Sequence, residues 1–160
     1  MHTRYLEGVT IRPLRDGDTL TVAAVFERLG PRSRERRFCG AKPRILDTEF
    51  DALARVDADH HVLVAYVDGD VKPVGMARLV RVGDAAEIAF EVADAYQGKG
   101  VGSTLAHVLA SDARAAGITR LVATVCGDNP PVVSLLRRMA RSLHVTWQGG
   151  EREFVVGLGA

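Results

Sequence analysis

Glycines at positions 98, 100 and 102 separate a strand-like segment from a helical one. Residues 85–92 alternate in side-chain character as a strand does, and residues 103–116 repeat apolar side chains at helical spacing. A chain that turns through glycines directly into a helix exposes the unpaired N–H groups of the helix start and the positive end of its dipole. We therefore expect this segment to bind an anion, and a phosphate group fits best.

Known phosphate-binding loops differ in the residues around their glycines. A P-loop carries Lys-Ser or Lys-Thr after its last glycine, whereas Gly102 is followed by Ser103 with no lysine before it. A dinucleotide fingerprint has the spacing Gly-x-Gly-x-x-Gly and a later acidic residue. The spacing here is Gly-x-Gly-x-Gly, although Asp128 follows the next strand-like run, so a distorted form of that site stays open. A third pattern, Gln/Arg-x-x-Gly-x-Gly/Ala, is matched in full from Gln97 to Gly102; a plain glycine turn is the remaining alternative.

Composition excludes several classes of protein. The 160 residues predict a single domain over residues 1–160. A net charge of +1 provides no general attraction for nucleic acid or an anionic membrane. No apolar run approaches the roughly 20 residues that span a bilayer, and the first eight residues lack the apolar core of a signal peptide. We expect neither nucleic acid nor a membrane as a partner.

The cysteines and the paired histidines give no sign of a metal site. Cys39 and Cys126 are far apart in the sequence, and the neighbours His60 and His61 would point away from each other on a strand or helix. We expect a reducing and cytoplasmic setting and no bound metal.

The order of the remaining segments predicts an α+β, or mixed α/β, fold. Gly30-Pro31 is expected to end a helix that starts near Asp18. Further helices are predicted from Ser33, from Thr48 and from Pro130. The predicted strands are residues 9–14, a meander of 62–67, 74–82 and 85–92, a buried strand at 120–125, and a hairpin of 144–147 and 152–156.

This order, with Gln97 to Gly102, resembles a Gcn5-related N-acetyltransferase (GNAT). Residues 33–38 and 86–102 are also similar to the acetyltransferase domain of bacterial protein lysine acetyltransferases. The resemblance implies the GNAT fold: a six- to seven-stranded, mostly antiparallel sheet with one parallel, splayed pair, flanked by helices. Some of those proteins carry a fused cyclic-nucleotide-binding domain, and we expect none within these 160 residues.

The same resemblance implies acetyl-CoA as co-substrate. The main chain of Phe90, Glu91 and Val92 is then expected to bind the pantetheine arm. The pyrophosphate is assigned to Gln97, Gly98, Lys99, Gly100, Val101, Gly102 and Ser103. Asn129 matches an asparagine that contacts the cofactor arm, although capping the next helix is an equally good role for it.

The chemistry requires a base, because a lysine amine is protonated at neutral pH, with a pKa of about 10.4. Glu87 matches the general-base glutamate of the resembled subfamily, and Glu91, on the same strand face, is the reserve candidate. Residues 135–143 hold no tyrosine that could serve as general acid. Covalent catalysis by Cys126 is disfavoured, because no neighbouring base activates it and a buried, inert thiol is the commoner case.

We therefore expect an acetyl-CoA-dependent N-acetyltransferase that moves an acetyl group directly to a primary amine, with a protein lysine favoured. A small-molecule amine is the alternative acceptor, and a non-catalytic acyl-CoA sensor is the alternative class. The sequence leaves the oligomeric state open, a homodimer included.

Overall fold

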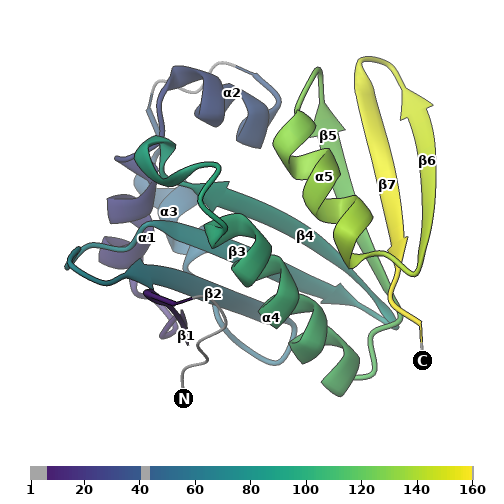
Figure 1. The fold of residues 1–160 in the computed structure, drawn as a ribbon, viewed down its shortest axis with the longest axis horizontal. Helices are drawn as coiled ribbons and strands as arrows, with labels where there is room; N and C mark the ends of the chain where they lie inside the picture. The colour runs from purple at the N-terminus through teal and green to yellow at the C-terminus, as the bar shows by residue number, and fades with distance from the viewer. Residues whose placement is uncertain (1–6, 41–43, 160) are drawn as a thin grey trace.

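Seven strands form one sheet in the order β1-β2-β3-β4-β5-β7-β6, within the residues that the structure, a computed structural model, describes: 7–40 and 44–159 (Figure 1). All neighbouring strands are antiparallel except β4 and β5. The predicted α+β class and the single parallel pair are therefore confirmed. The strands are β1 (Val9–Pro13), β2 (His60–Val67), β3 (Gly75–Val82), β4 (Ala85–Val92), β5 (Arg120–Cys126), β6 (Ser142–Gln148) and β7 (Glu151–Gly157).

Helices cover the sheet on both faces (Figure 1). Helices α1 (Thr19–Phe26), α2 (Pro31–Phe38) and α3 (Asp47–Leu53) lie on one face, and α4 (Val101–Ala115) and α5 (Pro130–Met139) lie on the other. A short 3-10 turn, η1 (Asp94–Tyr96), connects β4 to the glycine loop.

The pair Gly30-Pro31 has a different role from the predicted one. Helix α1 ends at Phe26, and Gly30 caps the start of α2, with Pro31 as the first helical residue. Proline suits this position because the N–H that it lacks has no partner inside a helix. Glycine followed by proline can thus begin a helix as well as end one.

Two apolar cores result from the alternation along the strands. On β4, Ala86 and Ile88 pack toward α4, whereas Glu87 and Glu91 belong to the face of α1, α2 and α3. Helix α4 buries Leu105, Val108 and Leu109 at helical spacing. Each such side chain contributes about 1.5–3 kcal/mol through burial, which fixes α4, and the loop before it, firmly to the sheet.

The parallel pairing of β4 with β5 is short. It runs from Ala85 opposite Arg120 to Glu87 opposite Val122 and stops there. Strand β3, on the other side, stays paired with β4 as far as Val92. Beyond Glu87 the two parallel strands therefore diverge, and Figure 1 shows this opening between β4 and β5.

Among the described residues, no helix combines the length and the apolar character needed to cross a bilayer.

Candidate active site

A cavity of about 670 Å³ occupies the opening between β4 and β5. It is bordered by β4, the glycine loop, the starts of α4 and α5, β5 and helix α2. Of the residues predicted from sequence, the cavity brings together Glu87, Phe90, Glu91, Val92, Gln97, Gly98, Gly100, Gly102, Ser103 and Asn129.

The glycine loop has the geometry of an anion cradle. Gly98 and Gly100 have φ angles of 73° and 87°, a region that glycine adopts at little cost. Space is tight at Gly102, because a Cβ there would lie 3.2 Å from Cδ1 of Leu135 on α5, which would then have to shift. Gly100 is the N-cap of α4, and no side chain among the described residues caps this helix start. Its first N–H groups thus face the cavity with the positive end of the dipole, as a phosphate requires.

Gln97 is exposed, and its side chain makes hydrogen bonds that hold this loop. Its Nε2 donates to the carbonyl oxygen of Val92, at 3.0 Å, and to Oγ of Ser33 on α2, at 3.1 Å. The Ser33 hydroxyl in turn donates to Asp94 of η1 at 2.7 Å. The end of β4, the loop and α2 are therefore connected by side-chain hydrogen bonds.

The main chain of β4 presents polar groups to the opening. Ala93 donates its N–H to the carbonyl oxygen of Val74, on the β3 side. Because backbone groups alternate along a strand, those of Phe90 and Val92 turn the other way, toward the diverging β5. An extended ligand with amide groups can supply the partners that β5 no longer offers.

Glu87 stands where β4 and β5 separate, since it belongs to their last pair. Its side chain is exposed, borders the cavity and lies on the face of the sheet that carries α2. The carboxylate is therefore accessible to a molecule that enters between the strands.

Glu91, the reserve candidate, has a different environment. Its side chain is 1% exposed, and Oε1 accepts a hydrogen bond from Nε of Arg37 on α2 at 2.5 Å. Its other oxygen, Oε2, is buried without a hydrogen-bond partner among the described residues. Arg78 of β3 lies near both glutamates, and burial lowers the pKa of its guanidinium. Glu91 is therefore ion-paired inside the fold, whereas the side chain of Glu87 is exposed.

Three further predicted residues have distinct placements. Asn129 precedes Pro130 at the start of α5 but makes no side-chain capping bond, so its amide remains available to a ligand in the cavity. Val101 is buried in the core and can offer only its main chain. Lys99 does not border the cavity, and its Nζ lies 5.6 Å from the ring centroid of Tyr96.

Arg138 was not predicted from the sequence. From α5 its Nη1 donates to Oγ of Ser103 at 2.8 Å, and its Nη2 donates to Oγ of Ser134 at 3.1 Å. The guanidinium thus lies beside the start of α4, on the border of the same cavity. The sequence did contain a signal, the basic pair Arg137-Arg138 in the last turn of a predicted helix. Only tertiary contacts show which of the two arginines lies beside the start of α4.

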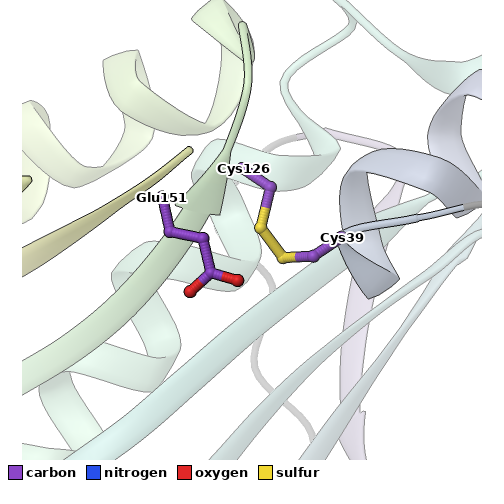
Figure 2. A group of neighbouring side chains, drawn as sticks. All are labelled: Cys39, Cys126 and Glu151. Carbon is purple, nitrogen blue, oxygen red and sulfur yellow. A yellow bond between two sulfur atoms is a disulfide. The ribbon is translucent and has the colours of Figure 1, made fainter. Parts of the chain in front are cut away.

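The expectation of an inert, buried thiol at Cys126 is wrong. Cys39, the residue after α2, and Cys126, the last residue of β5, form a disulfide across 87 positions of sequence (Figure 2). Their Cα atoms are 5.3 Å apart, within the usual range for a disulfide. Glu151 of β7 completes a group whose potential ligand atoms lie within 4.8 Å of one another, but the two sulfurs are bonded to each other and offer no thiolate. Cys126 is consequently no free nucleophile in this state.

Comparison with known proteins places the chain in a family. The model of the acetyltransferase (GNAT) family matches residues 25–140. The acetyltransferase Pat of Mycolicibacterium smegmatis is 33% identical over 144 residues, which cover 87% of this chain and 43% of that protein. The chain therefore spans less than half the length of this relative.

Solved structures agree with the fold. The GNAT domain of S. lividans PAT is 26% identical, with a TM-score of 0.84 over 94% of this chain and 90% of that one. The acetyltransferase YncA of Salmonella typhimurium, solved with its cofactor acetyl-CoA, has a TM-score of 0.69 at 21% identity, over 96% of this chain and 95% of that one.

Proposed function

Because the chain belongs to the GNAT acetyltransferase family, we propose that it transfers the acetyl group of acetyl-CoA directly to the amine of a protein lysine, with Glu87 as general base. The observation that carries this proposal is the position of Glu87. Its exposed carboxylate stands where β4 and β5 part, beside the main-chain groups that face the opening.

The cavity fits acetyl-CoA, which supplies an activated acetyl thioester. The uncapped start of α4 and the positive-φ glycines suit its pyrophosphate. The main chain of Phe90 and Val92 suits the amides of its pantetheine arm, and the Val92 N–H can also polarise the thioester carbonyl. Asn129 and Ser103 border the same path.

Glu87 accepts the proton that keeps the lysine amine of the acceptor from attacking the thioester. A lysine side chain, with a pKa of about 10.4, must lose a proton before its nitrogen can attack. An exposed carboxylate at the vertex of the opening can accept it, directly or through one water molecule. No side chain is assigned as general acid: the Tyr96 hydroxyl donates to Asp70 at 2.8 Å, and thiolates leave readily without protonation.

A protein lysine is favoured over a small amine by similarity alone. The support is the resemblance of residues 33–38 and 86–102 to bacterial protein lysine acetyltransferases, and the identity with the acetyltransferase Pat. Similar sequence at the donor site does not fix the acceptor. The acceptor is therefore best identified by mapping acetylated lysines on candidate proteins by mass spectrometry, beside a panel of small amines; binding of acetyl-CoA without turnover of any amine would identify a sensor.

The test of the base is Glu87→Gln. We expect this variant to bind acetyl-CoA as the wild type does and to lose about 10²-fold or more of its turnover near neutral pH, measured as release of the CoA thiol. Glu27→Gln, which removes an exposed carboxylate at the end of α1, is the control and should keep full activity. Unchanged turnover in Glu87→Gln would rule out this residue as the base.

A further inference from the structure

We infer that the Cys39–Cys126 disulfide selects acceptors by size: the closed bond keeps polypeptides away from Glu87, and reduction admits them. This inference rests on the proposed acetyl transfer to an amine. Four sets of observations carry it: the position of the bond, the weak packing of α2, the other attachments of this helix and the accessibility of the sulfurs.

The bond fastens the end of α2 to β5, which is one side of the opening between the diverging strands. Glu87 and Val122 form the last parallel pair, so Glu91 on β4 and Cys126 on β5 both lie four residues beyond it. The end of α2 reaches both strands at this level, since Arg37 is paired with Glu91 and Cys39 is bonded to Cys126. Figure 2 shows the disulfide running from the end of α2 to the end of β5. Helix α2 therefore connects the two sides of the opening.

Little apolar packing holds α2 in place. None of its eight residues is buried, and four of them are arginines. Its last residue, Phe38, is only partly buried, with its ring centroid 5.6 Å from that of Phe26. A helix with so little buried surface relies on specific attachments.

These attachments differ between the two ends of α2. At its start, the N–H of Gly30 and the hydroxyl of Ser33 both donate to the Asp94 carboxylate, which connects α2 to η1. At its end, the Arg37–Glu91 pair holds the β4 side, and on the β5 side the disulfide is the covalent connection. Reduction thus releases the C-terminal end of α2 from β5 and leaves the contacts beside the glycine loop intact.

The disulfide is accessible to exchange. Cys39 is exposed and Cys126 is half-buried. A low-molecular-weight thiol can attack the Cys39 sulfur, release the Cys126 thiolate and form a mixed disulfide; a second such thiol then completes the reduction. Two protein thiols and one low-molecular-weight disulfide result, and the reverse exchange restores the bond.

The effect of this release on acetyl transfer depends on the size of the acceptor. Cys39 borders the cavity that contains Glu87, so the bond lies on the route between α2 and β5. A small amine needs only a narrow path past it. A polypeptide lysine brings its flanking main chain, which requires α2 and β5 to separate. The reduced protein should therefore accept polypeptides, while the oxidised protein should retain activity on small amines.

The experiment compares kcat/KM of the oxidised and the reduced protein for two acceptors, an intact protein and a small primary amine. Both acceptors are first identified with the reduced enzyme. A chelator is present throughout, and the redox state is verified by thiol titration. We expect kcat/KM for the protein acceptor to fall at least about tenfold on oxidation, because only rare open molecules remain competent. The value for the small amine should change less than twofold. Cys39→Ser and Cys126→Ser should each behave like the reduced wild type in both conditions.

Hydrogen exchange of the main chain provides a readout that needs no acceptor. On reduction, exchange should become faster in residues 31–39 and stay unchanged in α4. Any one of three results would overturn the inference. These are equal hydrogen exchange of residues 31–39 in the two states, equal kcat/KM for the protein acceptor, and failure of the Cys39 and Cys126 thiols to form the disulfide under oxidising conditions. If no amine is acetylated in either state, the proposed function fails, and hydrogen exchange alone then decides whether the disulfide restrains α2.

Discussion

Arg138 carries a positive charge to a position that is already electropositive. Its guanidinium bonds to Ser103 beside the uncapped start of α4, where the helix dipole is positive. A phosphate of acetyl-CoA in the glycine loop would relieve this repulsion. We expect Arg138→Gln to raise the dissociation constant of acetyl-CoA by at least about tenfold, since a charge-assisted hydrogen bond contributes about 1.5–3 kcal/mol and about 1.4 kcal/mol is tenfold in affinity. Isothermal titration calorimetry measures this change in the dissociation constant.

Arg137→Gln is the matched control for this residue. It removes the same charge from an exposed neighbour on the same turn of α5, and it should change affinity less than twofold. The loss in Arg138→Gln should also shrink at high salt, because the wild-type attraction is screened there. Equal effects of the two substitutions would mean that only the general charge of α5 matters.

At the scale of elements, a network of four residues connects η1 to the turn before β3. Asp70 accepts hydrogen bonds from Arg28 and from the Tyr96 hydroxyl, each at 2.8 Å, and from the Lys72 N–H at 3.0 Å. The hydrogen bond from Arg28, followed by those from Lys72 and Tyr96, lowers the pKa of Asp70 to about 2 from its usual 3.8. A carboxyl group with a lowered pKa in the folded state stabilises the protein above its unfolded pKa, and this contribution disappears as the pH falls through about 2.

The prediction is that Asp70→Asn unfolds at lower urea concentration than the wild type near neutral pH. The difference should stay constant down to about pH 4 and vanish toward pH 2, because the wild-type carboxyl is then protonated too. Asp51→Asn, an exposed substitution on α3, controls for the loss of one negative charge. A difference that persists unchanged at about pH 2 would show that the network acts through packing instead of charge.

At the scale of the whole molecule, the disulfide joins two layers of the fold. It connects α2 to β5 across 87 residues of sequence, so in the chain-entropy description it stabilises the folded state by about 4–5 kcal/mol. Reduction should lower the melting temperature on the order of 10 °C for a protein of this size. Differential scanning calorimetry with and without reductant measures this shift.

The variant with both Cys39→Ser and Cys126→Ser serves as the control for reduction. It should melt at the temperature of the reduced wild type, whether or not reductant is present. A reductant-dependent shift in this variant would point to an effect of the reagent itself. If the reduced and oxidised wild type melt together, then the unfolded chain is not restrained as the entropy argument requires.

Local patterns determined most of the elements and the glycine loop. Alternation along β4 separates Glu87 from Ile88, and glycine spacing produces the turn into α4, because both depend only on neighbouring residues. Gly30-Pro31 shows the limit of such signals, since the same pair is compatible with a helix end and a helix start.

Contacts between distant segments of the chain were decided by tertiary structure. The pairs Cys39–Cys126 and Arg37–Glu91 join residues that are distant in sequence, as does the contact between Arg138 and Ser103. Periodicity fixes which face of an element a residue occupies but not which element packs against it. The point where β4 and β5 part, and the helix that spans the opening, follow from the packing of the two cores. The glycine loop thus indicated the donor from sequence, through the family that it resembles, whereas only the folded chain shows that α2 is bonded to β5 beside the cavity.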